Sequence, residues 1–248
     1  MKRYFIYLAY NGTAYCGWQM QNNGTSVQQV LTAALRTVLR EPSLTIMGAG
    51  RTDTGVHATE MVAHFDVNEA IENAVELCGK LNRFLPKDIA VKKIIPVKND
   101  AHARFDAVLR QYEYHIITEK NVFKNHLAAR FDMPLDFEKM NIAAAVLKEY
   151  RDFTSFSKLH TDVKTNNCQI SAAKWEQRGD EWVFVVAADR FLRNMVRAIV
   201  GTLLEVGKGK ISLDEFRGII ESKNRNNAGM SVPAHGLYLV KVEYPNNE

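Results

Sequence analysis

The sequence has few cysteines, and they form none of the groupings in which cysteines act together. Its three cysteines, Cys16, Cys78 and Cys168, lie far apart in a chain of 248 residues. An odd number of widely spaced cysteines gives neither a disulfide framework nor a CxxC metal motif. This pattern argues against a small secreted scaffold, and we expect a cytoplasmic protein.

Long apolar runs are also absent. Met1-Lys2-Arg3 leads directly into the apolar stretch Tyr4–Leu8, whereas a secretory signal needs an apolar region of about 7 to 15 residues and a small-residue cleavage site. A membrane-spanning helix needs about 20 apolar residues. We therefore expect neither export nor membrane insertion.

Charge of one sign is not in strong excess either. Lys and Arg number 32 against 28 for Asp and Glu, which gives a net charge of +4. This small excess permits a polyanionic partner without requiring one. With 46% hydrophobic and 24% charged residues, the composition is typical of a folded soluble protein long enough for one large domain or two lobes.

Alternating apolar residues and turn signals predict several strands along the whole chain. We expect them at 4–10, 44–47, 59–67, 89–97, 107–118 and 237–244, with a hairpin at 168–188 that turns at Gly179-Asp180. Their order is too irregular for a doubly wound parallel sheet. The pattern indicates an α+β fold with a largely antiparallel sheet.

Capping residues and helical spacing predict the helices between these strands. Ser26 and Gln29 form a capping-box pattern that begins a helix ending at Glu41-Pro42, and Asn68 is expected to cap a helix through Ile71, Val75 and Leu81. Further helices are expected at 136–149, 190–207 and 212–222.

A polar stretch at 120–134 interrupts the periodic pattern and is interpreted as a crossing between two lobes. This interpretation gives an N-terminal lobe at 1–119, the crossing at 120–134, and a C-terminal lobe at 135–248. We expect two similar mixed α/β lobes that share the sheet, with helices packed on it.

The segment GAGRTDTGVHA, residues 48–58, is the richest in chemical groups. Its glycines free the backbone, while Asp53 follows Arg51 and precedes His57. A simple turn in which Asp53 bonds its own backbone is the competing interpretation. No second His or Cys lies at metal-ligand spacing from His57, so a structural role for His57 is favoured and no metal is expected.

Residues Gly50 to His57 resemble the catalytic loop GRTDxGVH of the tRNA pseudouridine synthase A family. Four further segments resemble the same family in the same order, namely Leu109–Tyr114, Asp152–Phe156, Phe191–Gly201 and Gly236–Leu239. The resemblance spans nearly the whole chain. It implies an enzyme with a central RNA-binding cleft that converts uridine to pseudouridine in tRNA without a cofactor. It also implies that the lobe at 1–119 is the catalytic lobe and that the lobe at 135–248 completes the active site.

The resemblance assigns the chemistry to Asp53. One ionised carboxylate beside the ribose would either attack C1′ as a nucleophile or remove the C2′ proton as a base. The residues do not choose between the two routes. A rival interpretation, a hydrolase that uses Asp53 with His57, lacks a nucleophile motif such as GxSxG.

Four other site residues are also implied by the resemblance. Arg197 would pair with the catalytic carboxylate, Arg51 would help extrude the target nucleotide, Tyr112 would stack on the base, and Leu237 would form an apolar floor. Surface ion pairs for the arginines, an ordinary strand position for Tyr112 and a plain core position for Leu237 are the alternatives. Tyr112 and Tyr114 share one face by alternation, so only the family selects Tyr112.

The resemblance further implies a tRNA partner, a homodimer and a target uridine in the anticodon stem-loop, at tRNA positions 38–40. No DNA or membrane partner is expected. Arg193 and the stretch Lys164–Gln169 depart from the family pattern, and both concern substrate handling. The alternative function is a non-catalytic RNA-binding or RNA-folding protein that uses the same basic cleft.

Overall fold

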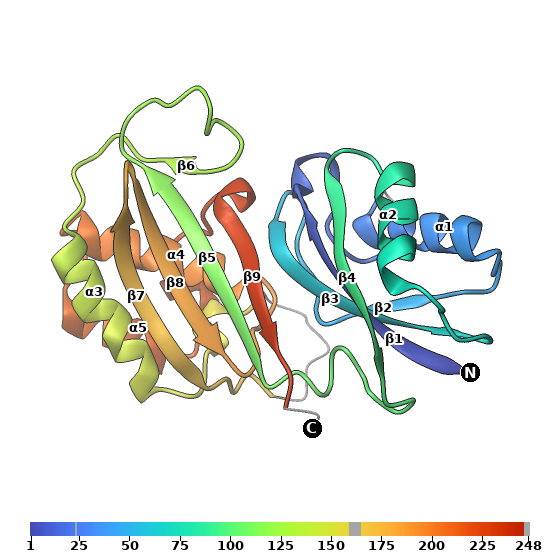
Figure 1. The fold of residues 1–248 in the computed structure, drawn as a ribbon. Helices are drawn as coiled ribbons and strands as arrows, with labels where there is room; N and C mark the ends of the chain where they lie inside the picture. The colour runs from blue at the N-terminus through green and yellow to red at the C-terminus, as the bar shows by residue number, and fades with distance from the viewer. Residues whose placement is uncertain (23, 159–164, 246–248) are drawn as a thin grey trace. The chain divides into compact units, whose positions relative to one another are not determined.

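The computed structural model describes residues 1–22, 24–158 and 165–245. The chain forms two compact units, the first comprising Met1–Val108 with Tyr238–Glu248 and the second Leu109–Leu237. In each unit helices pack on strands (Figure 1). The α+β prediction with a largely antiparallel arrangement is confirmed. Residues 120–134 belong to the second unit.

The first unit is built on four long strands and one short strand. Their order is β4 (Ile89–Val97), β1 (Lys2–Tyr10), β3 (His57–Val67) and β9 (Leu237–Glu243), and β2 (Ile46–Gly48) also pairs with β3. β1 is antiparallel to both neighbours. β3 and β9 run parallel through the pairs His57–Tyr238 and Ala58–Leu239. The glycine-rich segment therefore connects β2 to β3.

Two helices pack on one side of these strands, α1 (Val27–Leu39) and α2 (Ala74–Phe84) (Figure 1). The Ser26 hydroxyl accepts a hydrogen bond from Gln29 N–H and begins α1 as predicted. Arg40 adopts a left-handed conformation, φ 57°, which ends the helix before Pro42. The buried face of α1 includes Leu31 and Leu35.

The predicted start of α2 is wrong, and its predicted buried face is right at Leu81 but wrong at Val75. Asn73, not Asn68, caps the helix, because its side chain accepts a hydrogen bond from Glu76 N–H at 3.0 Å. Leu77 and Leu81 are buried, whereas Val75 is 83% exposed.

The second unit combines an antiparallel sheet with three helices that lie on one side of it (Figure 1). The strand order is β5 (Leu109–Ile117), β8 (Glu181–Ala188) and β7 (Ile170–Arg178), and β6 (Ala129–Arg130) runs parallel to β5. The helices are α3 (Phe137–Val146), α4 (Met195–Gly207) and α5 (Leu213–Glu221). The predicted hairpin of β7 and β8 is confirmed, with Gly179 at φ 64° in its turn.

The predicted helix at 190–207 begins five residues later than expected, at Met195. Asn194 has φ 68°, a conformation that a right-handed helix cannot include. Tertiary contacts fix the preceding turn, because the Asp189 carboxylate accepts from Gln169 N–H and Arg190 N–H. These bonds replace the helical hydrogen bonds that sequence periodicity predicts.

The residues that the structure describes also form five short 3₁₀ turns: η1 (Gly12–Ala14), η2 (Leu147–Glu149), η3 (Thr154–Phe156), η4 (Arg225–Asn227) and η5 (Ala234–Gly236). In the parts of the chain that the structure describes, no helix is both long and apolar enough to cross a membrane.

Candidate active site

Asp53 lies in a tight turn between β2 and β3. Val56 N–H donates to the Asp53 carbonyl at 3.1 Å, and Gly55 occupies the third position of the turn with φ 79°. That positive φ is the reason a glycine is needed there. The turn fixes the main chain of Asp53, whose side chain is half-buried.

His57 secures the end of the same segment. Its ring is 1% exposed and stacks on Tyr238 with centroids 4.6 Å apart. Gly12 N–H donates to His57 Nδ1 at 3.0 Å, so Nδ1 is unprotonated and acts as an acceptor. These are the contacts of a structural residue. Within the described ranges, no group of three or more His, Cys, Asp or Glu side chains is placed to hold a metal.

The two tyrosines that share a face of β5 differ in burial. Tyr114 is fully buried, and its hydroxyl donates to the Pro233 carbonyl at 2.9 Å. Burial raises the pKa of Tyr114 above its usual value. Tyr112 is half-buried, and its ring packs edge-on against that of Phe191, with centroids 5.1 Å apart. Tyr114 is therefore a core residue, and Tyr112 keeps part of its surface accessible.

Arg197 lies in the first turn of α4 and binds the segment 232–237. Its Nε donates to the Val232 carbonyl at 2.7 Å, and Val232 N–H donates back to the Arg197 carbonyl at 3.2 Å. Leu237, at the end of this segment, is 6% exposed. Because Tyr114 also binds this segment, the second unit joins β5, α4 and residues 232–237 in one packed region.

The remaining predicted residues lie on exposed parts of their units. Arg51 is exposed in the same segment as Asp53 in the first unit. Arg193 is exposed in the second unit, where its carbonyl accepts from Lys158 N–H at 3.1 Å. In the stretch Lys164–Gln169, Lys164 lies outside the described residues.

Sequence reasoning missed the residues that hold the Asp53 turn from outside. The Tyr10 and Thr52 hydroxyls form a buried hydrogen bond of 2.8 Å. These two residues are 42 positions apart in the chain, so no local pattern links them. The only signal in the sequence was a threonine next to Asp53.

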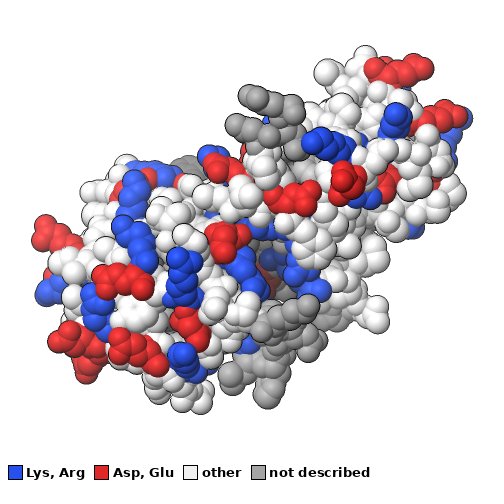
Figure 2. Space-filling view, turned by 90° about the horizontal axis from the view of Figure 1, so that it is seen from below, with Lys and Arg blue, Asp and Glu red and all other residues white. Residues whose placement is uncertain are grey.

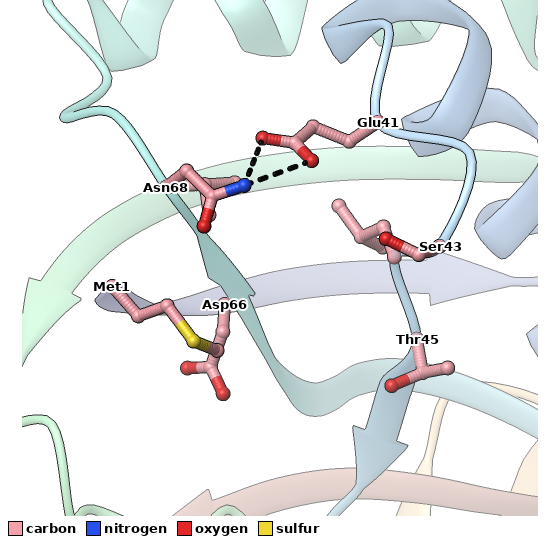
Figure 3. A pocket seen from close by; sticks show the side chains of 8 residues that line it. Met1, Glu41, Ser43, Thr45, Asp66 and Asn68 are labelled. Atoms are coloured by element: carbon pink, nitrogen blue, oxygen red, sulfur yellow. Dashed lines mark hydrogen bonds between the residues drawn. The ribbon is translucent and has the colours of Figure 1, made fainter.

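A surface pocket of the first unit lies away from this turn (Figure 3). It is lined by Met1, Glu41, Ser43, Leu44, Thr45, Asp66, Val67 and Asn68. Asp66 is near the C-terminal end of β3, whereas the Asp53 turn precedes the N-terminal end of that 11-residue strand. At about 3.3 Å per residue, the strand separates them by about 30 Å. The Asp66 carboxylate is already bound by Arg3 at 2.7 Å.

Charged side chains of both signs are interspersed over the second unit in Figure 2. Among the ion pairs of this unit are Arg178 with Glu113 at 2.9 Å and Lys124 with Glu181 at 3.0 Å, near the β7–β8 turn. Hydrogen bonds from His115 and Arg178 lower the pKa of Glu113 to about 2. Lysines and arginines that are paired with carboxylates attract a polyanion less strongly than unpaired ones, because the two charges largely cancel at a distance.

Comparison with known families gives a match over most of the chain. The family model described as tRNA pseudouridine synthase matches residues 6–106 and 143–245. The first match includes the Asp53 turn, and the second includes Arg197 and Leu237.

Individual relatives match over the full length. The tRNA pseudouridine synthase A of Parabacteroides distasonis is 60% identical over 245 residues, covering 99% of this chain and 97% of the relative. That of Bacteroides fragilis is 59% identical over 246 residues, with the same coverage of both chains. The protein of this name from the more distant Exiguobacterium sibiricum is 36% identical over 248 residues, 100% of this chain and 99% of its own. The chain therefore belongs to the tRNA pseudouridine synthase family.

Proposed function

We propose that this protein isomerises uridine to pseudouridine in the anticodon stem-loop of tRNA and that Asp53 is its catalytic residue. The observation that carries the proposal is the complete motif from Gly50 to His57, folded as a tight turn that fixes the Asp53 main chain. The full-length relatives bear the name of this activity.

The reaction needs little beyond a placed charge. The bond from uracil N1 to ribose C1′ breaks, the base turns, and C1′ joins C5, while the C5 proton is lost and N1 gains a proton. No atom is gained or lost overall. An ionised Asp53 carboxylate serves either as a nucleophile at C1′ or as a base at C2′, and both routes require its negative charge.

The other site residues support this step by position. We assign the Arg197 guanidinium to the Asp53 carboxylate as its counter-ion, Tyr112 to the face of the flipped uracil, and Leu237 to the apolar contact below it. Arg51 assists extrusion of the nucleotide. The commitment of the Tyr114 hydroxyl to Pro233 supports Tyr112 as the substrate-contacting tyrosine.

A single pair of variants tests the role of Asp53. Asp53→Asn keeps the shape of the side chain and removes the charge, so tritium release from C5-labelled uridine in tRNA should fall below detection while tRNA binding persists. Asp100→Asn makes the same change at an exposed carboxylate of the first unit and should keep wild-type turnover. Turnover of Asp53→Asn within tenfold of wild type would refute the assignment.

The same experiment tests the alternative of a non-catalytic RNA-binding protein. That alternative predicts tRNA binding by the wild-type protein without tritium release or pseudouridine in the product. Pseudouridine mapped to the anticodon stem-loop supports the proposed target, and pseudouridine found only elsewhere in the tRNA contradicts it.

We propose in addition that the active form is a homodimer that binds tRNA across both subunits. Analytical ultracentrifugation across a range of protein concentrations should give twice the mass of the 248-residue chain. A monomer at all concentrations that retains full activity would contradict this assembly.

A further inference from the structure

Residues 10–18, which we call the clamp segment, hold the Asp53 turn from outside the motif. Four hydrogen bonds join the two: Tyr10 hydroxyl to Thr52 hydroxyl at 2.8 Å, Trp18 N–H to Thr52 carbonyl at 3.3 Å, Gly55 N–H to Tyr15 carbonyl at 3.3 Å, and Gly12 N–H to His57 Nδ1 at 3.0 Å. These bonds involve Thr52, which precedes Asp53 in the sequence, and Gly55 and His57, which follow it. The main chain of the turn is therefore held both before and after Asp53.

The main chains of the clamp segment and the turn are in direct contact. A Cβ atom at Gly17, which has φ 82°, would lie 2.3 Å from the Thr52 carbonyl oxygen and 3.1 Å from the Asp53 carbonyl carbon. A Cβ at Gly12 would lie 2.0 Å from the Val56 carbonyl oxygen. Since no side chain fits between the two backbones, a displacement of one is passed directly to the other.

The clamp segment is itself held by α1. Val27 N–H donates to the Gly17 carbonyl at 3.2 Å, and Gln28 N–H donates to the Trp18 carbonyl at 3.0 Å. Trp18 is 2% exposed and its ring stacks with that of Tyr10, with centroids 6.2 Å apart. The segment is therefore a fixed support for the turn.

One side-chain bond of this contact adjoins the catalytic residue. Tyr10 and Thr52 are 4% and 8% exposed, so water does not readily replace their mutual hydrogen bond. The bond orients the β-branched Thr52 side chain, and Thr52 is joined to Asp53 by one peptide bond. Neither hydroxyl supplies the negative charge that the reaction needs.

We propose that Tyr10 is a positioning residue for the reaction, acting on Asp53 through the hydroxyl of Thr52. This inference rests on the proposed catalytic role of Asp53. Because misplacement of a reacting group by about 1 Å can reduce a rate by about 100-fold, loss of this bond should lower kcat by about 10- to 100-fold. The KM for tRNA should change less than threefold, because the Tyr10 side chain is buried and binds the turn from inside the first unit.

The test uses variants that remove hydroxyl groups and little else. Tyr10→Phe and Thr52→Val each delete one partner, the double variant deletes both and leaves no unpaired hydroxyl, and Thr52→Ser keeps the bond. Tyr7→Phe, on the same strand, is the matched control. Single-turnover rates, KM and melting temperature are measured for every form with one tRNA, alongside Asp53→Asn.

Positioning predicts similar losses in kcat for both single variants and the double variant, since all three lose the same bond. Thr52→Ser should recover at least half of the wild-type rate, and Tyr7→Phe should match wild type. Unchanged kcat in the double variant would overturn the proposal. The proposal would also be overturned if the variants were slower than wild type only near their melting temperatures, because partial unfolding would then explain the loss. A loss that appeared mainly as a higher KM would overturn it as well.

Hydrogen exchange separates failure of this inference from failure of the proposed function. In the double variant, amides of residues 52–57 should exchange faster than in wild type while the rest of the first unit is unchanged. If wild type and Asp53→Asn are equally inactive on tRNA, the proposed function fails whatever the exchange shows. If wild type is active and exchange of the turn does not change, the positioning role of Tyr10 is refuted.

Discussion

His64 provides a prediction of how stability depends on pH. It lies on β3 with 8% exposure, and its Nδ1 accepts a hydrogen bond from Ala103 N–H at 3.1 Å. Its ring packs edge-on against that of His102, with centroids 4.6 Å apart. Burial, with smaller contributions from the charges of Arg3 and His102, lowers the pKa of His64 from 6.5 to about 4.

The direction of the effect follows from the preference of the folded state for neutral His64. Well above pH 6.5 the imidazole is neutral in both states, and its contribution to stability is fully present. As the pH falls from 6.5 towards 4, the unfolded chain takes up the proton first and folding is penalised. At about 1.4 kcal/mol for each pKa unit, the free energy of unfolding should fall by about 3 kcal/mol between pH 7 and pH 4.

Substitution of His64 by Gln isolates this contribution. The Gln amide oxygen can accept from Ala103 N–H, but the side chain does not titrate. The free energy of unfolding is measured with urea at several pH values from 4 to 8. On acidification it should fall by about 3 kcal/mol less in His64→Gln than in wild type. His126→Gln makes the same change at an exposed position and should keep the wild-type loss. Equal losses in His64→Gln and wild type would refute the reasoning.

Three further predictions address the site, the partner and the packing. In single-turnover assays Tyr112→Phe should retain part of the rate, whereas Tyr112→Ala should lose about 1–3 kcal/mol of base stacking. Filter-binding affinity for tRNA should fall as salt rises, because phosphate contacts release counterions, and a salt-independent affinity would contradict a phosphate-contacting surface. Gly201→Ala should lower the melting temperature, since its Cβ would lie 1.8 Å from the Met230 carbonyl oxygen. The control Gly218→Ala, a helical site with open space around it, should be neutral or stabilising by up to about 1 kcal/mol.

Elements with strong local signals were predicted well from the sequence. The Ser26 cap and the Glu41-Pro42 stop bound α1 closely, because capping and helix termination depend on residues within one or two turns. The β7–β8 hairpin followed from Gly179-Asp180, since the glycine alone readily adopts the required positive φ. In both cases the physical cause lies within a few residues of its effect.

Predictions failed where two local signals competed or where distant contacts decided the outcome. Asn68 and Asn73 are both acceptable caps, and Asn73 is the one that begins the helix. Val75, which was expected on the apolar face, is exposed, and the buried positions are Leu77 and Leu81. The start of α4 depends on Asn194 and on the bonds made by Asp189 to a segment 20 residues away. Periodicity carries no information about such contacts.

A motif match can identify the proposed catalytic residue Asp53 without showing how the rest of the fold holds its turn. The motif from Gly50 to His57 contains the glycine that the turn needs, so resemblance alone places Asp53 on a constrained loop. The atoms that constrain it from outside belong to residues 10–18, namely Tyr10, Gly12, Tyr15, Gly17 and Trp18, and most of them are main-chain atoms. Main-chain contacts have no side-chain signature beyond the absence of a Cβ. An identical octapeptide in another protein, without a segment equivalent to residues 10–18, would keep the carboxylate but lose the support of its turn, and the catalytic role that we propose for Asp53 requires both.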